Sequence, residues 1–160
     1  MTKKEVIRDK LVNPTLYTYD YNLMNRLVRV VSHDGTATVY EYDELGNKKA
    51  VKHEGGLTIS YKYDSHSRMI NEIVIDKDSN VLMFCDDSYG NAGERTKSIE
   101  VVRNSSEDEN CKVICNRYEY DKLLRLTKEV ISIAENVKFS DVINTDVTAN
   151  NISKKSDNNV

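Results

Sequence analysis

The stretch that decides the fold is Tyr40-Glu41-Tyr42-Asp43, which continues as Glu44-Leu45-Gly46-Asn47. Four copies keep both tyrosines and the aspartate, and a worn copy at residues 84–87 keeps the aromatic and the last aspartate. The aspartates are spaced by 23, 21, 23 and 34 residues. Such a period indicates a small supersecondary unit stacked on copies of itself. The motif residues are Tyr17, Tyr19, Asp20, Tyr40, Tyr42, Asp43, Gly46, Tyr61, Tyr63, Asp64, Asp87, Gly90, Tyr118, Tyr120 and Asp121.

The consensus Tyr-x-Tyr-Asp-x-x-Gly-(Asn/Arg)-(Leu/Met) resembles the YD repeat of the RHS (rearrangement hotspot) family. Larger members of that family include bacterial polymorphic toxins, insecticidal toxin-complex subunits and teneurins. The resemblance covers residues 15–131, and it implies hairpins that wrap into a hollow shell, of which five repeats would form only an arc. The family's proline-glycine core motif, where the toxin domain is released, is not found, since the only proline is Pro14. We therefore expect a short repeat-only member or a fragment.

Each motif copy predicts a strand that ends in a turn. Residues i and i+2 of a strand lie on one face, so Tyr-x-Tyr places both rings together and a polar residue opposite. The aspartate opens the turn by accepting bonds from backbone N–H groups. Gly46 and Gly90 stand where a positive φ is expected, and Asn25 tolerates the same conformation. Ser67 and Leu124 do not favour it, so we expect distorted turns there.

After each turn the chain returns as a second strand, as in residues 26–32 and 68–75. A second turn follows, and Asp34-Gly35 predicts a type I′ hairpin. The fold class is therefore all-β: roughly ten antiparallel strands form a curled, open, meandering sheet. One face carries Tyr, Leu, Val and Ile, with the tyrosines expected to be core, and the other is polar.

The repeats predict three segments. Residues 1–14 are an N-terminal flank, expected to form a short helix that Asn13-Pro14 ends. Residues 15–143 are the YD-repeat β domain, whose apolar residues after Leu126 suggest one or two further strands. Residues 144–160 are a polar tail, expected to be disordered.

Composition excludes several function classes. The net charge of −3 shows no clustered basic excess, which argues against nucleic-acid binding. No stretch has the ~18 apolar residues of a membrane span, and no signal peptide is visible. Three cysteines, an odd number, favour reduced thiols over a disulfide framework. The chain is expected to stay in the cytoplasm or to leave by a signal-independent secretion system.

Candidate chemical sites are few and weak. Asp76-x-Asp78-x-Asn80 opens like a calcium loop, but the required sixth glycine and twelfth glutamate are Val81 and Asp87. Cys111 and Cys115 lack a second Cys/His pair for zinc. Asp86-Asp87 and the acidic residues 107–109 are paired only in sequence. We therefore expect no metal, no cofactor and no enzymatic activity.

The motif favours a non-catalytic structural and interaction module. Its partner would be a protein or a glycan, since tyrosine combines a large surface with a polar tip. Open sheet edges would also permit self-association. The alternative is a fragment of a polymorphic toxin delivery or encapsulation protein that lacks its toxin domain.

Overall fold

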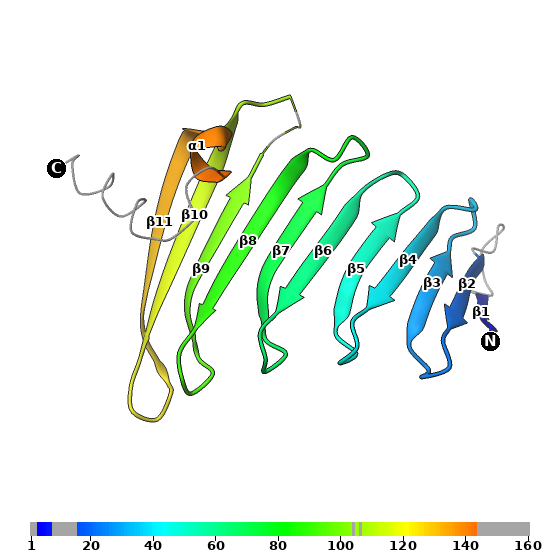
Figure 1. Ribbon diagram of the computed structural model, residues 1–160, viewed down its shortest axis with the longest axis horizontal. Helices are drawn as coiled ribbons and strands as arrows, with labels where there is room; N and C mark the ends of the chain where they lie inside the picture. The colour runs from blue at the N-terminus through cyan, green and yellow to red at the C-terminus, as the bar shows by residue number, and fades with distance from the viewer. Residues whose placement is uncertain (1–2, 8–15, 104, 106, 144–160) are drawn as a thin grey trace.

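The computed structural model describes residues 3–7, 16–103, 105 and 107–143. Eleven strands form one sheet, and each strand pairs antiparallel with its neighbours in chain order. Figure 1 shows the resulting fan of hairpins, with β1 at one edge and β11 at the other. The strands are β1 (Lys3–Ile7), β2 (Leu16–Tyr21), β3 (Leu27–Val31), β4 (Ala37–Tyr42), β5 (Lys48–His53), β6 (Thr58–Tyr63), β7 (Met69–Ile75), β8 (Val81–Tyr89), β9 (Arg95–Val102), β10 (Asn110–Tyr120) and β11 (Leu126–Lys138).

The predicted all-β class and open sheet are confirmed, but two elements differ from expectation. The predicted helix over residues 1–14 is wrong for residues 3–7, which form β1 and pair with β2. Residues 8–14 lie outside the described residues, as does the tail 144–160. The segment after Leu126 forms one 13-residue strand and then a short helix, α1 (Phe139–Ile143).

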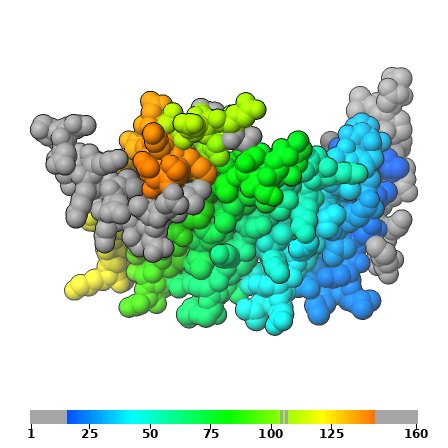
Figure 2. Space-filling model, turned by 45° about the horizontal axis from the view of Figure 1, so that its top comes forward, coloured from blue at the N-terminus to red at the C-terminus, as the bar shows by residue number. Residues whose placement is uncertain are grey.

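The strand register defines two faces of the sheet. Tyr40 pairs with Val51, which pairs in turn with Ile59, so these side chains share one face. We call this the tyrosine face, because Tyr19, Tyr61 and Tyr118 lie on it by the same register. The opposite face carries the pairs Val101–Val113 and Ile99–Cys115. We call it the helix face, because α1 lies against it (Figures 1 and 2).

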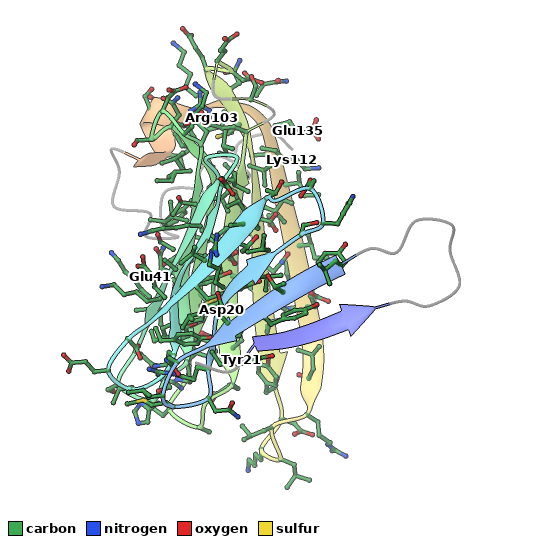
Figure 3. All side chains as sticks on the ribbon, turned by 90° about the vertical axis from the view of Figure 1, so that its right-hand side faces the viewer. Asp20, Tyr21, Glu41, Arg103, Lys112 and Glu135 are labelled. Carbon is green, nitrogen blue, oxygen red and sulfur yellow. The ribbon has the colours of Figure 1, made fainter. Side chains whose placement is uncertain are left out.

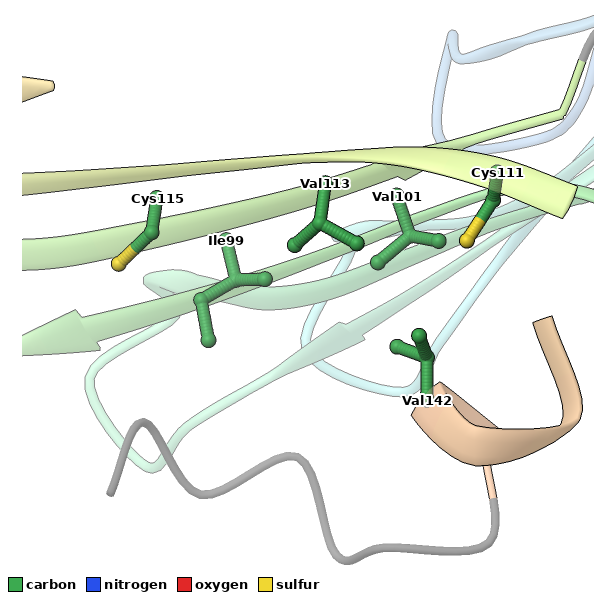
Figure 4. Packing of buried hydrophobic residues seen from close by; sticks show 6 residues of the cluster. All are labelled: Ile99, Val101, Cys111, Val113, Cys115 and Val142. Atoms are coloured by element: carbon green, nitrogen blue, oxygen red, sulfur yellow. The ribbon is translucent and has the colours of Figure 1, made fainter. Parts of the chain in front are cut away.

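The largest buried cluster lies on the helix face at the β9–β10 end of the sheet. Figure 4 shows Val142 of α1 facing the apolar side chains of these two strands. Full burial of such an aliphatic side chain stabilises the fold by about 1.5–3 kcal/mol. Viewed from the β1 end, Figure 3 shows α1 to one side of the sheet. The buried members are Ile99, Val101, Cys111, Val113, Cys115 and Val142.

Candidate functional site

Eight hairpin turns share one backbone pattern. In each, the first residue donates its N–H to the carbonyl of the fifth and accepts the N–H of the fourth. The fourth residue always has a positive φ, which is typical of a tight turn followed by a bulged residue. The opening residues are Asn22, Ser32, Asp43, His53, Asp64, Asp76, Gly90 and Asp121.

This pattern corrects the predicted phase of two copies. In the first, Asn22 opens the turn, and Asp20 is a buried residue of β2. In the worn copy Gly90 opens the turn, and Asp87 is buried in β8. The positive φ predicted for Gly90 therefore belongs to Gly93, at 93°. Sequence alone missed this shift because hydrogen bonds, and not residue identity, define where a turn begins.

Two predictions about individual turns are also wrong. The type I′ turn at Asp34-Gly35 requires a positive φ at both residues, and only Gly35 has one. The turns of Ser67 and Leu124 are not distorted, because their N–H groups bond to Asp64 and Asp121 at 3.0 Å each, as in the glycine turns. Backbone pairing on both sides of the turn holds these residues at φ 59° despite the steric cost.

Carboxylates cap the turns that begin with aspartate. Asp64 Oδ1 accepts the N–H groups of His66 and Arg68, and Asp121 Oδ1 accepts the matching pair. The Asn47 amide lowers the pKa of Asp43, and the Arg125 N–H lowers the pKa of Asp121. Burial tends to raise the pKa of Asp64, but the bonds from Arg68 outweigh it and lower the value. These turns are therefore held by ionised carboxylates.

In four copies, the tyrosine directly before the motif turn ties its hairpin to the preceding one. The motif turns are those that open at Asn22, Asp43, Asp64, Gly90 and Asp121, so in the worn copy this tyrosine is Tyr89. The tyrosine hydroxyl donates to a backbone carbonyl that lies five residues after the opening residue of the preceding motif turn. The donor–acceptor distances span 2.8–3.0 Å, so all four are good hydrogen bonds. The pairs are Tyr42 with Leu27, Tyr63 with Lys48, Tyr89 with Met69, and Tyr120 with Arg95.

Two arginines reinforce these tyrosine contacts. The guanidinium carbons of Arg26 and Arg68 lie 4.7 and 4.8 Å from the ring centroids of Tyr42 and Tyr89, respectively. Each arginine also approaches the turn glycine of the next hairpin, since a Cβ on Gly46 would lie 3.2 Å from Arg26 Nη1. Gly46 therefore has two roles: it permits a positive φ and leaves room for Arg26.

The first tyrosines of the motif lie on the tyrosine face, where they are half-buried. The prediction that they form the core is wrong, because no tyrosine belongs to the buried hydrophobic residues and Tyr17 is 37% exposed. Partial burial, assisted by the nearby Glu72 carboxylate, raises the pKa of Tyr61. The core instead lies on the helix face, where α1 supplies a covering layer that sequence periodicity does not reveal.

The acidic pair Asp86-Asp87 does not form a joint site. Asp86 pairs with Ile99 on the helix face, and Asp87 pairs with Ser98 on the tyrosine face. Adjacent strand residues point to opposite sides of a sheet, so the two carboxylates cannot act on one substrate. Burial raises the pKa of Asp86. Asp87 instead forms an ion pair, in which its Oδ2 lies 3.5 Å from Arg95 Nη2.

The remaining candidates occupy structural positions. Asp76 Oδ1 accepts the N–H groups of Asp78 and Asn80, which caps a hairpin turn. Cys85, Cys111 and Cys115 are free thiols. Across the described ranges, no three acidic, histidine or cysteine side chains gather as a metal site. In the same part of the chain, no helix is long and apolar enough to cross a bilayer.

The β11 edge is a candidate surface for a partner. Its 13 residues pair with β10 on one side only. Several large apolar side chains are exposed along β11, whereas the residues of the buried cluster lie in β9, β10 and α1. Unpaired backbone groups beside apolar side chains favour the addition of another strand. The exposed residues are Leu126, Val130, Ile131 and Ile133.

These features define a class: a single-layer sheet of repeated hairpins joined by tyrosine contacts. Residues 21–56 match the RHS Repeat family model, so the resemblance to RHS/YD-repeat proteins is confirmed. That segment begins at Tyr21 and includes the Tyr42–Leu27 contact. No curated protein matches the chain.

Solved Tc toxin structures are similar in fold. A crystal structure of TcdB2-TccC3-Cdc42 matches with a TM-score of 0.51 and 16% identity, covering 74% of this chain and 7% of that chain. A crystal structure of TcdB2-TccC3-TEV gives 0.39 and 11%, covering 84% and 11%. The Photorhabdus luminescens Tc holotoxin pore with a TccC3 mutation gives 0.38 and 11%, covering 84% and 10%. This chain thus spans a small part of those proteins.

Proposed function

We propose that this protein is a non-catalytic structural and interaction module that binds another protein through its open sheet edge. The RHS repeat and the fold of the Tc toxin neighbour support a structural shell module related to toxins. The observation that carries the protein-binding role is the long, apolar, unpaired edge of β11.

The alternative is a role within a toxin delivery or encapsulation assembly. The neighbours named as Tc toxin complexes favour this setting. Both versions require the same physical event, because an arc of sheet becomes part of a shell only when further strands extend its edges. Glycan binding through the tyrosine face stays a prediction; the half-buried rings offer less stacking area than fully exposed ones would.

The test is the molar mass of the purified chain by light scattering, alone and with the proteins encoded beside it. Ile131→Lys places a charge on the edge strand at a residue that is 58% exposed. Its register partner is Asn116, so the new lysine does not face a like charge. The control is Leu23→Lys, which adds the same charge at a fully exposed turn residue away from the β11 edge.

We expect assembly, with itself or with a co-purified protein, that Ile131→Lys abolishes and Leu23→Lys leaves intact. A monomer that neither change affects and that captures no partner would overturn the proposed function. Circular dichroism on each variant checks that the sheet is still folded.

A further inference from the structure

The last motif turn presents the acceptor half of a tyrosine contact, with no tyrosine on it among the described residues. Each earlier motif turn supplies a carbonyl five residues after its opening residue, and a tyrosine hydroxyl of the next hairpin bonds to it. The same spacing from Asp121 leads to Leu126, at the start of β11. Leu126 is 53% exposed on the outer edge of the sheet.

Arg125 stands beside this carbonyl in the position that Arg68 occupies two motif turns earlier. Both arginines donate Nε–H to the Oδ2 of their turn aspartate at 2.7 Å, which fixes the two guanidinium groups alike. Arg68 is covered by the Tyr89 ring, and its side chain is 29% exposed. The Arg125 side chain is 74% exposed. The aspartate bond therefore holds the guanidinium in place with its face open.

The fifth residue of each motif turn also indicates which kind of turn the next hairpin carries. Arg26 and Arg68 each meet a glycine turn, at Gly46 and Gly93. Asn47 instead donates to the Ser67 hydroxyl at 3.2 Å. Within this chain, arginine at that position is thus matched with a turn glycine. By the same pairing, Arg125 is expected to meet a turn glycine. An added Cβ would lie 3.2 Å from Arg26 Nη1 at Gly46 and 3.9 Å from Arg68 Nη1 at Gly93, so the fit is tight at the first and an ordinary contact at the second.

We propose that Arg125 and the Leu126 carbonyl form a docking socket for a protein hairpin carrying tyrosine followed four residues later by glycine. The hairpin pairs antiparallel with β11, its tyrosine hydroxyl bonds to the Leu126 carbonyl, and its ring stacks on Arg125. This inference rests on the proposed function and names the partner's chemistry. The cation–π contact with Arg125 and the hydrogen bond to the Leu126 carbonyl both contribute affinity. Because they hold one tyrosine at one place, they also fix the register of the added strand on β11.

The probe is a backbone-cyclised peptide of residues 37–53, the chain's own hairpin with Tyr42 and Gly46, labelled for fluorescence anisotropy. Cyclisation reduces the ordering cost of binding. The peptide is titrated with the full chain and with Arg125→Gln. Lys122→Gln removes the same charge from the same turn and is the control. In the peptide, Tyr42→Phe removes the hydroxyl, and Tyr40→Phe is its control.

We expect Tyr42→Phe and Arg125→Gln each to weaken binding by about threefold to tenfold, since a hydrogen bond contributes about 0.5–1.5 kcal/mol. The two losses should combine to less than their product, because both groups act in one contact. Gly46→Ala in the peptide should weaken binding only to protein that retains Arg125.

Absence of binding, or binding that responds to these changes no more than to their controls, overturns the socket. Ile131→Lys separates the two proposals. If it abolishes peptide binding while Arg125→Gln does not, the edge binds strands without the socket and the proposed function stands. Arg125→Lys, which keeps the charge but not the planar group, checks that loss of binding does not reflect misfolding.

Discussion

At the residue scale, Leu124 is the clearest conflict between side chain and backbone. Its φ of 59° is a conformation that costs an ordinary residue about 1–2 kcal/mol. Leu124→Gly removes this strain but increases the entropy of the unfolded chain. We expect a net stabilisation of about 0.5–1 kcal/mol, measured as the free energy of unfolding in urea.

Gly35→Ala is the reciprocal change, because φ at Gly35 is 86° and nothing lies within 4 Å of an added Cβ. It should destabilise the fold by about 1 kcal/mol through the backbone alone. Equal stabilities for the wild type and Leu124→Gly would mean that side-chain packing compensates the strain at Leu124, which is 49% exposed.

At the element scale, the turns capped by aspartate make the free energy of unfolding depend on pH. The pKa values of Asp43, Asp64 and Asp121 are lowered in the folded chain, so their ionised forms favour folding. This contribution is complete above the unfolded pKa of about 4 and is lost as the pH falls through the lower folded values. We expect the free energy of unfolding to fall in this range, and to fall less in a triple Asp→Asn variant.

Asp86 provides a control of opposite sign. Burial raises its pKa, so its ionised form opposes folding, and the penalty is relieved as the pH falls through the raised value. Asp86→Asn should therefore stabilise the chain at neutral pH. The change also removes the negative charge that favours the protonated form of Lys97, which offsets part of this gain. If the free energy of unfolding of the triple Asp→Asn variant falls with pH as much as that of the wild type, the turn carboxylates do not cause the loss of stability in acid.

At the scale of the whole molecule, the sheet is nearly one-dimensional. Most contacts between elements join strands that follow one another in the chain, as in repeat proteins. Each hairpin therefore depends on the hairpins beside it. The buried cluster involves β9, β10 and α1, whereas no residue of β2 or β3 except Asp20 is buried. Stability should therefore decrease from the β11 end toward the β1 end.

Hydrogen exchange tests this gradient. Amides of β9 and β10 should exchange at least tenfold more slowly than those of β3, because local opening of β3 exposes little apolar surface. Mass spectrometry on peptides of the native chain measures both regions at once. Uniform protection would indicate a single cooperative unit, in which the tyrosine contacts couple the hairpins more strongly than apolar burial does.

Local sequence patterns were enough to predict the repeat, the all-β class and the order of the hairpins. Tyr-x-Tyr alternation and turn residues such as Asp43 and Gly46 act within a few residues of one another, and local rules describe such effects. The tertiary structure set the phase of the first and the worn copies, the role of the tyrosine before each motif turn and the face that holds the core. The hydrogen bond from Tyr42 to Leu27, and the packing of Val142 in the buried cluster of β9 and β10, join residues distant in sequence. Their energies depend on which strands become neighbours, which local periodicity does not specify.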